Sequence, residues 1–273
     1  MILLRQCVAE IIGTFLLVLF GTGAVAAAVL TGAQQGLWQV AVVWGFGITV
    51  AIYATGAISG AHLNPAVSLT FAIFRRDTFP IRNLLPYWLS QLVGGILGGL
   101  TILVTFGPFI KHFEESNGII RGQAGSELSG MIFGEYFPNP AVFGTSIDAK
   151  ELISPIGALG IEAFGTGILV FVILALIDRR NSSISVKSLA PFFIGFTVAV
   201  LISVFAPLTQ GGWNPARDFG PRIVAYLAGW GSIAIPGPSS GFWIYIIGPM
   251  IGGPLGGLLY ETLIKKNLPS EET

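Results

Sequence analysis

Long runs of apolar residues dominate the chain, and short polar segments separate them. Six runs have close to the roughly 20 residues that a helix needs to cross the hydrocarbon core of a bilayer. They lie approximately at residues 8–30, 37–57, 84–107, 153–177, 189–206 and 242–264. The pattern therefore predicts an all-α integral membrane protein with six transmembrane helices, the first of them retained rather than cleaved as a signal peptide.

Two further apolar stretches, 65–74 and 215–228, each follow an Asn-Pro-Ala tripeptide, at Asn64 and at Asn214. Asparagine is a favoured helix N-cap and proline is favoured at the first helical position, so each tripeptide predicts a helix start. The first stretch is too short to span a bilayer, and the second carries charged residues in its opening turns. We interpret both as re-entrant half-helices. The irregular backbone before each must be buried in protein or line a water-filled cavity.

The chain also repeats itself. Glu10-Ile-Ile-Gly13-Thr14 matches Glu162-Ala-Phe-Gly165-Thr166, and Gly94-Gly95-Ile-Leu-Gly98-Gly99 matches Gly252-Gly253-Pro-Leu-Gly256-Gly257. Each half holds three spans, so the second half inserts upside down. Inverted repeats with paired broken helices are typical of membrane transport proteins with a site at the midplane. We expect one channel domain over residues 1–273, with repeat one at about 1–107, an extracytoplasmic loop at 108–152, repeat two at about 153–264 and a short cytoplasmic tail at 265–273.

Basic residues predict the orientation, because short cytoplasmic segments are enriched in lysine and arginine. With the N-terminus inside, the inner segments contain Arg5, Arg75, Arg76, Arg82, Arg179, Arg180, Lys187, Lys265 and Lys266. The 108–152 loop contains only Lys111, Arg121 and Lys150. We therefore expect the protein in a cell membrane, either a plasma membrane or a bacterial inner membrane. Both termini should lie on the cytoplasmic side.

Composition narrows the chemistry. The chain is 53% hydrophobic and 10% charged with no net charge, which argues against a nucleic-acid partner. One cysteine and two histidines make an internal disulfide impossible and a protein-built zinc site implausible. No nucleophile–base or metal constellation is evident, so we expect no catalytic residue, no metal and no cofactor.

Two helix starts that meet near the bilayer centre repel cations, because each N-terminus carries roughly half a positive charge. Asn64 and Asn214 can cap their helices through oxygen and direct amide donors into the pathway. We expect extended backbone before each tripeptide to supply carbonyl acceptors, from Gly60, Ala61, His62, Gln210 and Gly212.

Charged residues at membrane depth are by default functional. Arg217 lies in the first turn after Asn214 and is interpreted as pore-lining, with structural pairing to Asp218 as the alternative. Glu10 and Glu162 are interpreted as acceptors that support the re-entrant loops. A proton relay, as in a proton-coupled secondary transporter, is the less favoured alternative. A third copy at Asn139-Pro140-Ala141 lies in the polar loop without a symmetric partner and is not assigned to the pathway.

At these motifs the chain resembles the major intrinsic protein family of aquaporins and aquaglyceroporins. The residues that carry the resemblance are Ser59 to Val67, Asn214 to Arg222 and the two Glu-x-x-Gly-Thr segments. The resemblance implies a homotetramer with one pore in each subunit. Asp218, and the Phe-Pro-Asn-Pro sequence at 137–140, resemble the glycerol-conducting branch.

The resemblance also implies a selectivity ring formed by Trp44, Ile202, Gly211 and Arg217. Gly211 departs from the aromatic residue typical of glycerol facilitators and would widen the ring. The sequence leaves open whether Trp213, a bulky neighbour, refills that space. We expect a passive channel for glycerol and similar polyols, with water as co-permeant. A water-selective member and a channel for urea or neutral metalloid hydroxides remain alternatives.

Overall fold

The computed structural model describes residues 2–183 and 185–269. In these ranges six helices are long and apolar enough to span a membrane, and no strand is present. The long helices are α1 Ile2–Thr31, α2 Leu37–Ser59, α4 Leu84–Ser116, α8 Pro155–Ile177, α9 Ala190–Thr209 and α11 Ile244–Leu259. The six predicted spans are confirmed, and the chain is a multi-pass, all-α membrane protein.

Each Asn-Pro-Ala tripeptide begins a short helix. The first half-helix, α3, covers Pro65–Phe74, as predicted. The second, α10, covers Pro215–Ala225 and then changes into a π-helical turn at Tyr226–Trp230. The α-helix therefore ends at Ala225, before the predicted end at residue 228. In the turn that follows, Gly229 adopts a φ of 105°.

The boundaries of the third span differ most from the prediction. Helix α4 continues to Ser116 rather than ending near 107, and it contains Pro108. Hydropathy marks the edge of the apolar layer, whereas the helix continues as long as its polar groups find partners. At the end of the helix the Asn117 N–H still donates to the Phe113 carbonyl at 3.1 Å, and the Glu114 carboxylate pairs with Arg121 at 2.7 Å. The predicted 108–152 loop thus begins inside a helix. Residues 270–273 of the predicted tail lie outside the described residues.

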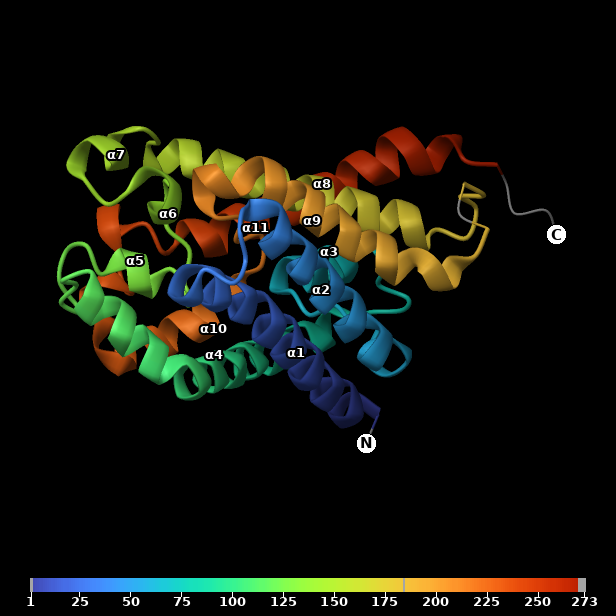
Figure 1. Cartoon of the computed structure of the whole chain (residues 1–273). Helices are drawn as coiled ribbons and strands as arrows, with labels where there is room; N and C mark the ends of the chain where they lie inside the picture. The colour runs from blue at the N-terminus through green and yellow to red at the C-terminus, as the bar shows by residue number, and fades with distance from the viewer. Residues whose placement is uncertain (1, 184, 270–273) are drawn as a thin grey trace.

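The cap segment, residues 117–154, contains three short helices: α5 Glu127–Gly130, α6 Pro140–Phe143 and α7 Ile147–Glu151. These helices lie together at one end of the molecule, while α1 begins toward the other end (Figure 1). The two half-helices lie within the bundle, and each packs mainly against a long helix of the opposite half, α3 against α11 and α10 against α4.

The repeated glycine pairs bring these helices into close contact. A Cβ atom on Gly252 would lie 1.9 Å from the Ala163 carbonyl oxygen of α8, and one on Gly94 would lie 2.5 Å from the Ile11 oxygen of α1. The next glycine in each pair faces a half-helix, with Gly95 against the Ala216 oxygen at 2.5 Å. Small residues at this spacing let helix backbones approach in membranes. They place the two half-helices end to end at the centre.

Candidate functional site

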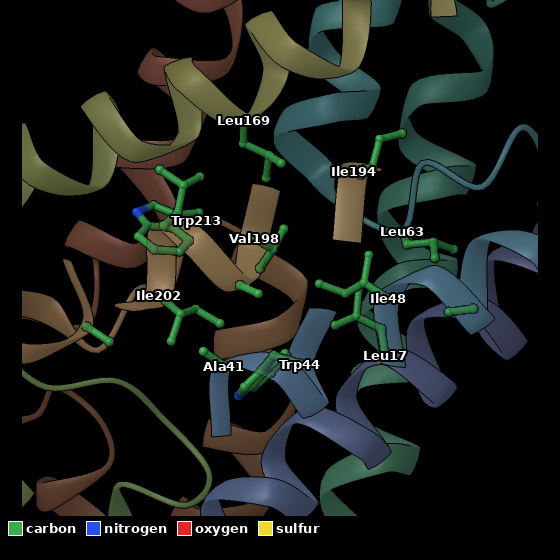
Figure 2. Packing of buried hydrophobic residues seen from close by; sticks show 14 of the residues in the cluster. Leu17, Ala41, Trp44, Ile48, Leu63, Leu169, Ile194, Val198, Ile202 and Trp213 are labelled. Carbon is green, nitrogen blue, oxygen red and sulfur yellow. The ribbon is translucent and has the colours of Figure 1, made fainter. Parts of the chain in front are cut away.

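A cavity of about 440 Å³ runs along the junction of the two half-helices. Side chains and backbone of both halves line it, together with apolar side chains of four long helices. Among the predicted site residues, the lining includes Trp44, Gly60, Ala61, His62, Asn64, Ile202, Gly211, Gly212, Asn214 and Arg217. Figure 2 shows several of the apolar side chains converging on this space. The predicted pathway residues of the two halves therefore meet in one cavity.

Gln210 does not belong to this lining. Its side chain instead bonds to the cap segment, accepting a hydrogen bond from the Tyr136 N–H at 2.8 Å and donating to the Met131 carbonyl at 3.4 Å. The residue caps α9 in the left-handed conformation, with a φ of 61°. The Gln210 side chain therefore contacts the cap segment. The prediction of extended backbone is wrong at this residue, whereas the role of its backbone carbonyl as an acceptor stays a prediction.

Asn64 and Asn214 join the two half-helices reciprocally. Each side-chain oxygen accepts a hydrogen bond from its own helix, from the Ala66 N–H at 2.8 Å and the Ala216 N–H at 3.1 Å. The Asn64 amide donates to the Trp213 carbonyl at 2.9 Å, and the Asn214 amide donates to the Leu63 carbonyl at 2.8 Å. An NH₂ group has two N–H donors, so one donor of each amide makes this cross-link. Capping follows from the sequence, whereas the cross-link does not.

Glu10 and Glu162 are fully buried beneath the two loops. Glu10 accepts hydrogen bonds from the backbone N–H groups of His62 at 3.0 Å and Leu63 at 2.7 Å. Glu162 does the same for Gly212 at 3.1 Å and Trp213 at 2.7 Å. A hydroxyl from the end of the preceding helix adds a further bond in each half, Ser59 to Glu10 and Thr209 to Glu162, both at 2.7 Å.

Arg217 contacts the cavity from the first turn of α10. Its guanidinium carbon lies 4.3 Å from the ring centroid of Trp44, a cation–π geometry. The guanidinium also forms an ion pair with Glu135 of the cap segment. Burial raises the pKa of the Glu135 carboxyl to about 8, and the nearby Arg217 partly opposes that rise. Sequence reasoning assigned Glu135 no role in the pathway, since nothing in its local pattern indicates a partner 82 residues away.

Asp218 does not pair with Arg217. It binds Arg222 one helical turn later at 2.7 Å and accepts a hydrogen bond from the Glu135 backbone N–H at 2.7 Å. Arg222 in turn donates to the Glu135 carbonyl oxygen at 2.5 Å and to the Ala234 carbonyl at 2.9 Å. Asp218 and Arg222 therefore attach the cap segment to α10 and position Glu135 beside Arg217.

The third tripeptide builds a similar cap in a different place. Asn139 accepts a hydrogen bond from the Ala141 N–H at 2.9 Å and donates to the Ala206 carbonyl of α9 at 3.0 Å. The helix that follows has only four residues, and Asn139 does not line the cavity. Across residues 2–183 and 185–269, no group of three or more His, Cys, Asp or Glu side chains could hold a metal ion.

Comparisons with known proteins add to this geometry. A family profile described as "Major intrinsic protein" matches residues 1–260. The chain is 40% identical to the glycerol uptake facilitator protein of Pseudomonas aeruginosa over 270 residues, covering 98% of this chain and 91% of that protein. It is 39% identical to the propanediol uptake facilitator PduF of Citrobacter freundii over 266 residues, covering 97% and 93%.

A solved structure, that of the aquaglyceroporin from Plasmodium falciparum, superimposes with a TM-score of 0.79 at 25% sequence identity. The superposition covers 96% of this chain and 97% of that one. The match extends over both repeats and the cap segment.

Proposed function

The chain belongs to the major intrinsic protein family, and on that premise we propose that it is a passive channel for glycerol and related small polyols, with water as co-permeant. The names of the relatives, which are uptake facilitators for glycerol and propanediol, support this solute class. The observation that carries the proposal is the amphipathic lining of the cavity beside Arg217. Its guanidinium supplies fixed donors for hydroxyl groups, while Trp44 and Ile202 supply apolar contacts for carbon.

The proposed pathway has two parts. Asn64 and Asn214 form the constriction where the half-helices meet, and the second N–H of each amide is left to serve a solute hydroxyl. Backbone carbonyls of Gly60, Ala61 and His62 on one side, and of Gly212 on the other, form the acceptors. Their membership of the cavity lining supports these roles.

Exclusion of ions follows from the same residues. The N-termini of α3 and α10 both point to the junction, and Arg217 adds a full positive charge close by. Helix N-termini and an arginine at a pore raise the barrier for cations and protons. Neutral solutes avoid this barrier and exchange their water hydrogen bonds for bonds to the lining.

The setting we propose is a plasma membrane or bacterial inner membrane with both termini in the cytoplasm. The excess of basic residues in the inner segments supports this orientation. We also propose a homotetramer with one pore in each subunit. Broad apolar outer faces, including Phe46, Val104 and Phe164, suit contact with lipid and with neighbouring subunits.

Stopped-flow light scattering on proteoliposomes tests the function. We expect glycerol and water to equilibrate faster than in empty liposomes, and urea to serve as the comparison solute. A glycerol flux equal to that of empty liposomes contradicts the proposal, whereas rapid water flux alone indicates a water-selective channel. Glycerol uptake that requires a proton gradient indicates a coupled transporter instead.

A further inference from the structure

The ring around Arg217 lacks a side chain at one of its four positions. Gly211 lines the cavity there and adopts a φ of 81°, a left-handed conformation that favours glycine. A ring with only Trp44, Ile202 and Arg217 as side chains would leave a gap on the fourth side.

The indole of Trp213 occupies this gap. A Cβ atom on Gly211 would lie 2.8 Å from Cη2, 3.0 Å from Cζ3 and 3.1 Å from Cζ2 of Trp213. The edge of the six-membered ring therefore stands where a side chain at 211 would begin. Trp213 is 2% exposed and lines the cavity, and Figure 2 shows its ring near Ile202 and facing the same space as Trp44.

A second glycine forms the other side of the Trp213 site. A Cβ atom on Gly165 of α8 would lie 2.2 Å from the indole Nε1. Among the described residues, this nitrogen has no hydrogen-bond partner, although buried indoles usually have one. Packing between Gly165 and Gly211, rather than a polar contact, therefore holds the ring in place. The Trp213 backbone is fixed separately by its hydrogen bond to Glu162 at 2.7 Å.

The symmetric position of the first half shows that this arrangement is not simply a feature of the repeat. Leu63 also precedes its asparagine and packs against a glycine, Gly13, whose Cβ would lie 2.4 Å from Leu63 Cδ2. The residue matching Gly211 is Ala61, which carries a side chain. At the position before the asparagine, an aromatic ring occurs only in the half that contains Arg217.

We propose that Trp213 is the specificity-determining residue that restores the missing wall of the ring, an inference that rests on the proposed function. Its indole, Trp44 and Ile202 form three apolar walls beside the Arg217 donors. A three-carbon polyol can place its carbon edge on these walls and its hydroxyls toward Arg217. The width available to longer polyols is set by Trp213 and not by the absence of a side chain at Gly211.

The test compares glycerol with xylitol, a five-carbon polyol, in proteoliposomes that contain the full chain. Trp213→Leu introduces the residue found at the symmetric position, and we expect the xylitol-to-glycerol permeability ratio to rise about tenfold. Trp213→Phe keeps a smaller aromatic ring and should raise the ratio less. Phe164→Leu removes an exposed aromatic ring from the outer face of α8; it is the matched control and should leave the ratio at the wild-type value.

A double variant, Gly211→Phe with Trp213→Leu, moves the aromatic ring to the other position and should lower the ratio toward the wild-type value. The proposal is overturned if Trp213→Leu and Trp213→Phe both conduct glycerol with the wild-type ratio. It is also overturned if the double variant is as permissive as Trp213→Leu. If Trp213→Leu does not assemble, the permeability ratio of Trp213→Phe alone decides the test. A wild-type protein that fails to conduct glycerol counts against the proposed function itself, which separates the two failures.

Discussion

The two re-entrant loops are held by the same set of hydrogen bonds and close packing contacts, but they present different side chains to the cavity. In each, a buried glutamate accepts two backbone hydrogen bonds, an asparagine caps the half-helix, and a glycine of the glutamate's helix accommodates the residue before the asparagine. The first loop then continues with Val67, whereas the second continues with Arg217 at the matching position. The duplicated residues thus hold the loop backbone, and most of the proposed selectivity residues lie in the second half.

The surroundings of the two loops differ in the same way. Glu10 has an additional neutral partner, the Gln91 amide at 2.7 Å, and Gln91 also donates to Ser68 at 2.9 Å. The second loop lies instead beside the charged residues Glu135, Asp218 and Arg222. The backbone geometry is common to both loops, while charged residues of α10 and of the cap segment lie beside only the second loop.

The largest expected effect comes from removing the shared framework. Among the described residues, Glu10→Ala leaves four hydrogen-bond donors without their acceptor, and Glu162→Ala leaves three. An unsatisfied buried donor costs about 1–3 kcal/mol, so each variant should lose at least about 3 kcal/mol of stability, with Glu10→Ala losing more. Thermal unfolding in detergent measures the loss, and the exposed Glu115→Ala is the control. If both glutamate variants are as stable as the wild type, the proposed support of the two loops by Glu10 and Glu162 is contradicted.

Alanine substitutions at the two glycine sites should lower the stability of the protein by different amounts in the two halves. Gly165→Ala introduces a methyl group against the rigid indole of Trp213, and Gly13→Ala introduces one against the flexible Leu63. Overpacking typically costs about 1–3 kcal/mol, and we expect Gly165→Ala near the upper end and Gly13→Ala near the lower. The same unfolding assay applies. Addition of Trp213→Leu should recover most of the Gly165→Ala loss, and equal costs in the two halves would argue against the difference.

Truncating the asparagines should distinguish the pathway copies from the third copy. Asn64→Ala, Asn214→Ala and Asn139→Ala each remove a helix cap and one amide hydrogen bond. Each should therefore cost about 2 kcal/mol of stability. Stopped-flow glycerol flux per folded protein should change in the first two variants only. A change of similar size in Asn139→Ala contradicts the assignment.

The smallest expected effect concerns the charge that only the second loop carries. Arg217→Ala should raise proton leakage about tenfold, equal to about 1.4 kcal/mol of barrier, because the half-helix N-termini remain. Val67→Ala is the matched control at the first loop and should leak like wild type. Decay of a pH gradient across proteoliposomes measures both. Glu135→Gln keeps Arg217 and should not leak, so leakage there would contradict a barrier based on Arg217.

The sequence by itself determined the six spans, the two half-helices, the repeat and the asparagine caps. Each of these depends on a local signal: the length of an apolar run, the preference of asparagine and proline for helix starts, or a motif that recurs in order. The prediction for α3 at residues 65–74 is confirmed to the residue. Helix ends were less accurate, as in α4, because hydropathy does not report where backbone hydrogen bonding stops.

Only the tertiary structure decided which residues of separate segments meet around the cavity. The cross-links from Asn64 to Trp213 and from Asn214 to Leu63 join residues 149 and 151 positions apart. The Glu135–Arg217 pair and the placement of the Trp213 indole beside Gly211 likewise depend on how separate segments pack. Such contacts leave no periodicity and no local preference in the chain, because they arise only once the two halves and the cap segment share one interior. The residue types were in the sequence, and the fold determined which of them face one another.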